Sequence, residues 1–191
     1  MSKNMTVEKT FASAIQNHQK NNFKAAEDLY NQILEIDPNH IKTIFFLGTL
    51  SVQTKNFDRA KQMLQKTIQA QPNNVDAYNN LGVVFKEFEE FQKAKDCFEK
   101  VIQIQPKHVD ALNNLGNVFK QLNEPQKAIN YYQKAIEIEP SYINAHQNLM
   151  DVCEKTNQIT ELKDAVSNAR TFFKDNSIIK LYEGILLSRN E

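Results

Sequence analysis

Few side chains in this sequence could carry out catalysis or bind a metal, and these few are scattered. None of the four histidines has a second histidine or a cysteine close by, a spacing that predicts no metal site: they are His18, His40, His108 and His146. Cys97 adjoins Phe98 and Cys153 stands at an apolar position, so we expect both thiols to be buried as small hydrophobic groups. The neighbouring carboxylates Glu89 and Glu90 lie in an expected turn, without the burial that acid–base catalysis needs.

The glycines are too far apart to build a nucleotide-binding loop. The chain has four of them, at positions 48, 82, 116 and 184. This spacing excludes the glycine-rich loops that cradle phosphates and the Gly-x-Ser-x-Gly turn of serine hydrolases. We therefore expect no catalytic residue, no cofactor and no metal, and a protein that is not an enzyme.

One set of polar side chains does recur regularly. Asn80, Asn114 and Asn148 are 34 residues apart, and Asn79 and Asn113 precede the first two. A side-chain amide offers an acceptor and donors that match the N–H and C=O of a peptide. The spacing predicts a row of groups able to hold the backbone of an extended segment.

The same 34-residue period organises the whole chain. It relates three of the glycines, and it also relates four prolines: Pro38, Pro72, Pro106 and Pro140. A fixed period of this length is typical of a solenoid, in which each repeat buries its apolar face against its neighbours. The period defines an N-terminal tail (1–6), five repeats and a last segment: 7–40, 41–74, 75–108, 109–142, 143–176 and 177–191.

The pattern within each repeat indicates two helices. Repeats 75–108 and 109–142 align without a gap, and the second carries Leu112, Leu115, Gly116, Phe119, Ala128, Tyr132, Ala135 and Pro140. This pattern resembles the tetratricopeptide repeat. The resemblance implies an all-α, right-handed superhelical solenoid of antiparallel helix pairs, in which the first helix of each pair, helix A, lines the concave wall.

The end repeats depart from the pattern. Repeat 7–40 has Ser13 and Ala14 in place of Leu-Gly, and repeat 143–176 loses the glycine and the proline. Segment 177–191 reads as one helix A with Gly184 in register, which predicts either a truncated sixth repeat of a longer protein or a capping helix.

We expect the ligand groove on the outward stripe of helix A. Its N-terminal part is apolar, its C-terminal part is rich in amides, and two lysines lie at its border. The run of asparagines resembles the asparagine ladder in the repeat region of O-linked N-acetylglucosamine transferase, although the 22 asparagines of the chain leave inherited sequence bias as an alternative. The candidate peptide-binding residues are Phe11, Phe45, Phe46, Asn79, Asn80, Asn113, Asn114, Asn117, Asn148, Lys86 and Lys120.

Composition and charge narrow the class of partner. Basic and acidic residues both number 23, so no basic excess favours nucleic acid, and no apolar run is long enough for a membrane span. We expect a cytoplasmic scaffold that binds a protein or an extended peptide. Two alternatives stay open: the substrate-recruiting region of a larger transferase, with a catalytic domain downstream, and a homo-oligomeric scaffold joined through Phe45 and Phe46.

Overall fold

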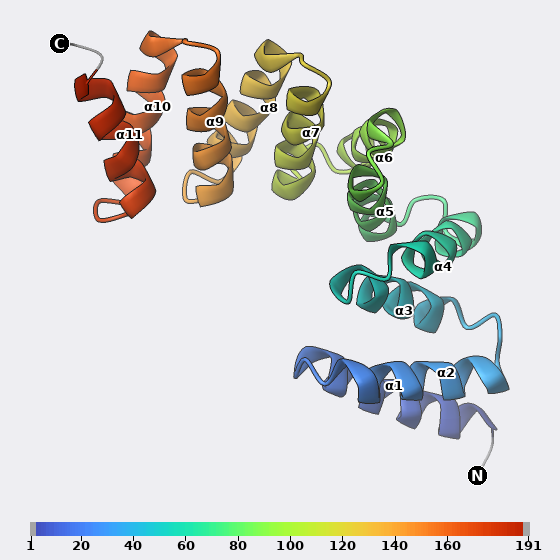
Figure 1. Cartoon of the computed structure of the whole chain (residues 1–191). Helices are drawn as coiled ribbons and strands as arrows, with labels where there is room; N and C mark the ends of the chain where they lie inside the picture. The colour runs from blue at the N-terminus through green and yellow to red at the C-terminus, as the bar shows by residue number, and fades with distance from the viewer. Residues whose placement is uncertain (1–2, 189–191) are drawn as a thin grey trace. The chain divides into compact units, whose positions relative to one another are not determined.

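The computed structural model describes residues 3–188, and within that range the chain is α-helical with short turns (Figure 1). The helices are α1 (Lys3–Gln19), α2 (Phe23–Ile36), α3 (Ile41–Gln53), α4 (Phe57–Ala70), α5 (Val75–Glu87), α6 (Phe91–Ile104), α7 (Val109–Gln121), α8 (Pro125–Ile138), α9 (Ile143–Lys155), α10 (Ile159–Phe172) and α11 (Ser177–Ser188). Odd-numbered helices are the predicted helices A, and even-numbered ones are the helices B. The all-α repeat architecture predicted from the period is confirmed.

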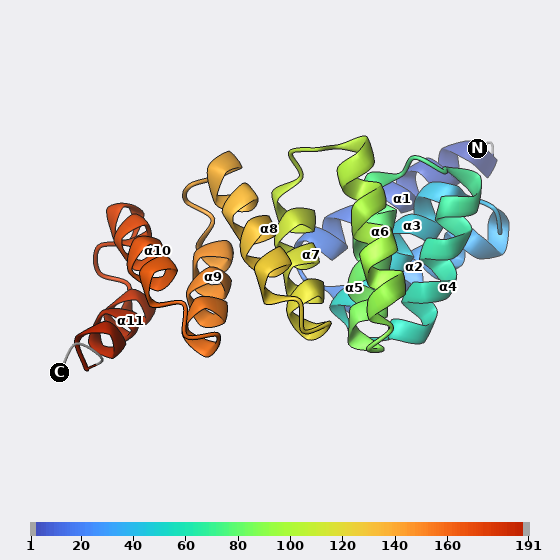
Figure 2. The ribbon, with the colours of Figure 1, turned by 90° about the horizontal axis from the view of Figure 1, so that it is seen from above.

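The chain divides into two compact units, with the division after Glu90. The N-terminal unit contains α1 to α5, and the C-terminal unit contains α6 to α11. Within each unit, helices A and B of one repeat pack as an antiparallel pair, and each helix B also packs on the helix A that follows it (Figures 1 and 2). Helices A of successive repeats touch as well, as α3 does with α5 and α7 with α9.

The repeated glycine lets the two helices of a pair approach closely. A Cβ added to Gly48 would lie 3.1 Å from Cγ of Leu64 on α4, and one added to Gly116 would lie 2.5 Å from Cε1 of Tyr132 on α8. Both partners stand at the same position of their repeats and are completely buried. At Gly116 the glycine is therefore required by the packing of α8, whereas a Cβ at Gly48 would make a tight contact with α4.

A left-handed residue turns the chain between helices A and B. Asn21, Lys55, Glu89, Asn123 and Asn157 have φ between 56° and 60° and lie 34 residues apart. Asparagine tolerates this conformation better than lysine or glutamate do. At the start of α8, Pro125 occupies the first turn of the helix, as its missing N–H predicts.

The residue before each helix A often caps it. His40, Asn74 and His108 share one repeat position, and each side chain accepts a hydrogen bond from the backbone N–H three residues on. Two of the four histidines thus serve as N-caps, and the sequence analysis assigned them no role.

The N-terminal boundary differs from expectation. Residues 1–6 were expected to form a tail, but α1 begins at Lys3, and residues 1–2 lie outside the described part of the chain. The first helix A extends beyond the repeat because Val7, its first core residue, is buried one turn after the helix starts. At the other end, residues 189–191 of the expected segment 177–191 also lie outside the described residues.

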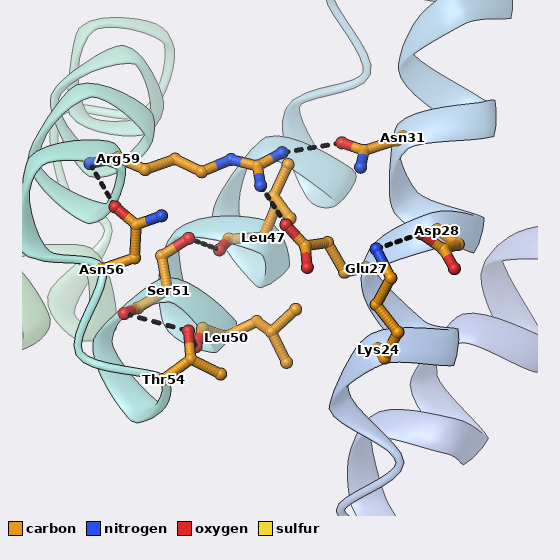
Figure 3. Close-up of polar contacts among 10 residues, drawn as sticks. All are labelled: Lys24, Glu27, Asp28, Asn31, Leu47, Leu50, Ser51, Thr54, Asn56 and Arg59. Atoms are coloured by element: carbon orange, nitrogen blue, oxygen red, sulfur yellow. Dashed lines mark hydrogen bonds and ion pairs between the residues drawn. The ribbon is translucent and has the colours of Figure 1, made fainter.

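A polar cluster fastens α4 to α2 in the N-terminal unit (Figure 3). The guanidinium of Arg59 pairs with the carboxylate of Glu27, and its Nη2 donates to Oδ1 of Asn31 at 2.7 Å. Asn56 caps α4 by accepting from the backbone N–H of Arg59. These contacts link helices B of adjacent repeats, on the side away from the predicted groove.

Between residues 3 and 188, none of the helices combines the length and the apolar composition that crossing a bilayer would require.

Candidate functional site: the faces of helices A

The predicted apolar end of the groove is part of a core cluster in the N-terminal unit. Phe11 on α1 and Phe46 on α3 pack edge to face with ring centroids 5.6 Å apart, and Tyr30 stacks on Phe46 at 6.4 Å. Phe45 packs against Phe46 at 5.2 Å. The three phenylalanines are half-buried, so Phe45 and Phe46 present only part of their rings to the second copy that the homo-oligomer alternative would join through them.

These rings are covered because helix A contacts more than its own helix B. The stripe assigned to the ligand groove also faces the helix A of the adjacent repeat, which buries part of it. His18 and Asn113, both on this stripe, have exposed fractions of only 9% and 6%. A pattern read within one repeat does not contain this lateral packing.

A hollow of about 380 Å³ remains between α1 and α3 on this face. Its apolar wall is formed by Ile15 and Phe46, and its polar rim includes Gln19, Thr49 and Gln53. It can take one apolar side chain while offering amide groups at its edge.

His18 orients the polar side of this hollow. Its Nε2 lies 2.8 Å from Oε1 of Gln53, and its Nδ1 lies 3.2 Å from the hydroxyl of Tyr30. With the amide oxygen as acceptor, the neutral ring carries its proton on Nε2, and Nδ1 accepts from the tyrosine hydroxyl. Sequence reasoning missed this residue. The signal in the sequence was His18 on helix A, twelve residues before Tyr30 of helix B, which stands at the repeat position of Tyr132.

The two candidate asparagines of the N-terminal unit differ in their surroundings. Nδ2 of Asn80 donates to the hydroxyl of Thr49 on α3 at 3.1 Å, which ties α5 to α3. Oδ1 of Asn79 is buried and has no hydrogen-bond partner among the described residues. Because Asn80 uses its Nδ2 for the bond to Thr49, its carbonyl oxygen stays available as an acceptor.

In the C-terminal unit, three of the four candidate asparagines make side-chain hydrogen bonds within the protein. Nδ2 of Asn148 on α9 donates to Oδ1 of Asn113 on α7 at 2.9 Å. Oδ1 of Asn117 accepts from the hydroxyl of Tyr132 at 2.8 Å, so it holds α8 against α7. Asn114 is half-buried on the same helix.

The two candidate lysines also differ. Nζ of Lys120 lies 3.2 Å from the carboxylate of Asp151 on α9, which Lys155 contacts as well at 2.8 Å. Burial raises the pKa of Asp151, but the hydrogen bonds from Lys155 and Lys120 outweigh it and hold that pKa below its ordinary value. Asp151 thus neutralises much of the charge that Lys120 was expected to offer a ligand. Lys86 is half-buried on α5.

The cysteines are buried and unpaired, as expected. Burial raises the pKa of Cys97 to about 12 and that of Cys153 to about 11, so both thiols stay protonated near neutral pH. Among residues 3–188 no group of three or more histidine, cysteine or carboxylate side chains is arranged to hold a metal ion.

Comparison with known proteins identifies the repeat. Models of the tetratricopeptide repeat match residues 18–82, 75–108 and 109–142. The chain belongs to the tetratricopeptide repeat family. No curated protein sequence matches it.

Solved structures with the same fold cover nearly the whole chain. A crystal structure of MamA protein is 26% identical with a TM-score of 0.78, over 88% of this chain and 92% of that one. PilF of Pseudomonas aeruginosa is 18% identical with a TM-score of 0.77, over 97% and 92%. YrrB, described as a TPR protein with an unusual peptide-binding site, is 17% identical with a TM-score of 0.75, over 92% and 90%. The chain therefore has the tetratricopeptide scaffold fold.

Proposed function

We propose that this protein is a non-catalytic scaffold that binds an extended segment of another protein on the faces of its helices A. The observation that carries the proposal is the hollow between α1 and α3, which combines an apolar wall with an amide rim. A peptide offers the matching groups, because each of its residues carries a backbone N–H and C=O beside its side chain. YrrB provides a precedent for a peptide-binding site on this fold.

In the N-terminal unit, an apolar side chain of the ligand enters the hollow against Ile15 and Phe46. The amides of Gln19 and Gln53 at the rim then bind the ligand backbone. Oδ1 of Asn80 accepts a peptide N–H, while its Nδ2 stays on the hydroxyl of Thr49. The hollow provides an apolar anchor, and the amides set the direction of the chain.

In the C-terminal unit, Asn114 and Asn148 have the same role. Asn148 donates only one of its two amide hydrogens to Asn113, which leaves the second hydrogen and the carbonyl oxygen for a ligand. Lys86 on α5 of the N-terminal unit and Lys120 on α7 of the C-terminal unit each lie at the border of a helix A face and favour an acidic ligand, Lys120 only weakly because of Asp151.

The expected affinity is modest. A hydrogen bond contributes about 0.5–1.5 kcal/mol net, since the peptide gives up bonds to water when it binds. Binding therefore depends on burial of the apolar anchor, and sequence preference comes from that anchor rather than from the amides.

The buried thiols are consistent with a reducing compartment, and we expect the scaffold in the cytoplasm.

The test is selection of peptides from a displayed random library on the intact chain, followed by titration of the best peptide. The triple substitution Asn80→Ala, Asn114→Ala and Asn148→Ala is expected to weaken binding by about tenfold or more, since it removes three pairs of possible bonds. The control variant carries Asn73→Ala and Asn130→Ala, which lie exposed in the turn before α5 and on α8. Equal affinity of wild type and triple variant, with unchanged thermal stability, would assign the asparagine run to sequence bias.

A further inference from the structure

A second groove lies on the helix B side of the C-terminal unit, away from the faces used in the proposed function. It has a volume of about 530 Å³ and runs between α8 and α10. Its floor is made of Ile136, Leu149 and Ala165, with exposed fractions of 7%, 6% and 5%. At one end stands Phe172, whose exposed fraction of 48% is large for an aromatic side chain in a packed helix. The groove can therefore bury apolar side chains of a partner.

All the charged side chains that line this groove are acidic. Glu137 stands on α8, and Glu161 and Asp164 stand on α10, so carboxylates flank the apolar floor on both sides. All three are exposed, and none forms an ion pair within the described part of the chain. A cation between the two walls would be attracted by all three carboxylates.

The neighbouring groove of the same unit has a different charge. It lies between α6 and α8, has a volume of about 400 Å³, and includes Lys95, Lys127 and Lys134 together with two glutamates. Lys127 and Lys134 occupy the same repeat positions in α8 that Glu161 and Asn168 occupy in α10. The acidic lining is thus a property of one groove and not of every repeat.

We propose that the groove between α8 and α10 binds a segment of a partner protein in which lysine or arginine side chains flank apolar ones. The apolar side chains pack on Ile136, Leu149 and the exposed ring of Phe172. The basic side chains on either flank meet Glu137 on one wall and Glu161 and Asp164 on the other. Charge complementarity of this kind mainly gives specificity and a faster association, while burial of the exposed ring of Phe172 adds to the affinity.

The probe for this site is a fluorescein-labelled amphipathic peptide of leucine and lysine, about four helical turns long. A second peptide carries glutamate in place of every lysine. Anisotropy titrations of the intact chain are expected to show saturable binding of the lysine peptide only. Absence of binding by the lysine peptide, or equal binding of both peptides, would overturn the proposal.

Substitutions locate the site. The variant Glu137→Lys, Glu161→Lys, Asp164→Lys is expected to weaken binding of the lysine peptide at least about fivefold, because each wall then repels it. The matched control Glu35→Lys, Asp58→Lys, Glu87→Lys has the same net charge and changes exposed carboxylates of the N-terminal unit, so its affinity is expected to stay within about twofold of wild type. Equal losses in the two variants would show attraction by net charge alone and contradict the proposal.

A second pair of variants tests the same site if the lysine variants fold poorly. Glu137→Gln, Glu161→Gln, Asp164→Asn keeps the shapes and removes the charges, and Glu35→Gln, Asp58→Asn, Glu87→Gln is its control.

A photo-reactive version of the lysine peptide is expected to cross-link to α8 and α10. Cross-links confined to the helix A faces would instead mean that the peptide occupies the site of the proposed function, and the groove proposal alone would fail.

Discussion

The glycines at one repeat position have opposite roles at different places in the chain. Gly116 has no room for a Cβ, because the ring of Tyr132 lies where that atom would be. Around Gly184, no atom lies within 4 Å of an added Cβ, and the residue is exposed on α11. Glycine at the same repeat position is thus required for packing in α7, whereas in α11 it only lowers the stability of the helix.

Replacing each of these two glycines by alanine is expected to change the stability in opposite directions. Gly116→Ala is expected to lower the free energy of unfolding by about 1–3 kcal/mol through overpacking against Tyr132. Gly184→Ala is expected to raise the stability of α11 by roughly 0.5–1 kcal/mol, since alanine loses less backbone entropy in a helix. Urea unfolding of both variants measures the difference. A destabilising Gly184→Ala would show that α11 packs against something at this position.

His146 is a buried histidine without a full set of partners. Its Nε2 lies 2.9 Å from the carbonyl oxygen of Pro140, its Nδ1 is buried with no partner among the described residues, and the rings of Phe172 and Phe173 lie against it. Burial lowers the pKa of His146 below the ordinary 6.5, and the hydrogen bond to Pro140 only partly offsets this.

Stability is expected to depend on this histidine in mild acid. The unfolded chain takes up a proton near pH 6.5 while the folded one does so only at lower pH, so the stability that the neutral ring contributes is lost as pH falls from about 6.5. His146→Leu removes this titration and is expected to flatten the decline between about pH 7.5 and 5.5. Urea midpoints over that range measure it. Parallel declines in wild type and variant would show that folding does not lower the pKa of His146.

At the scale of the elements, the turn between helices A and B sets the geometry of each pair. Three of its five left-handed positions hold asparagine, while Lys55 and Glu89 are strained there. Lys55→Gly is expected to raise the free energy of unfolding by about 0.5–1 kcal/mol, because glycine adopts this conformation without a steric penalty. Lys66→Gly, in the exposed face of α4, is expected to lower it by a similar amount. The midpoints of thermal unfolding of the two variants should shift in opposite directions relative to wild type. If both midpoints shift in the same direction, the role given to the turn is contradicted.

The helices themselves could be predicted almost completely from sequence. The proline period predicted where α2, α4, α6 and α8 end, and Pro125 lies where a missing N–H is tolerated. These features are local, because they depend on a single residue and its neighbours in the chain. The capping by His40 and His108 is also local, but histidine is not among the usual N-cap residues and gave no signal.

The candidate site was less predictable because it depends on contacts between repeats. Asn113 is buried and Phe46 is half-buried on faces where one helix A meets another. Lys120 pairs with Asp151, and Asn148 donates to Asn113, in each case between the adjacent helices α7 and α9. A helical pattern gives the direction of a side chain on its own helix. It does not give what the next repeat places in front of it.

At the scale of the whole molecule, the chain balances 23 basic against 23 acidic residues, yet its grooves are not neutral. The groove between α8 and α10 is acidic, and the one between α6 and α8 carries three lysines. Net charge therefore says little about partners. Binding of the lysine peptide is expected to weaken as salt rises from about 0.05 to 0.5 M, whereas binding of a peptide held by backbone bonds to amides is expected to change little. Titrations at both salt concentrations check this, and an unchanged affinity of the lysine peptide would contradict its charge-based docking.

The central claim is that peptide ligands bind through the amides of the helix A faces, and side-chain amide resonances test it most directly. At 22.1 kDa the protein suits two-dimensional NMR with a labelled chain and an unlabelled selected peptide. We expect the NH₂ resonances of Gln53, Asn80, Asn114 and Asn148 to shift on titration, and those of Asn31 and Asn130 on helices B to stay in place. Shifts confined to helix B amides, with the helix A amides unchanged, would contradict the account.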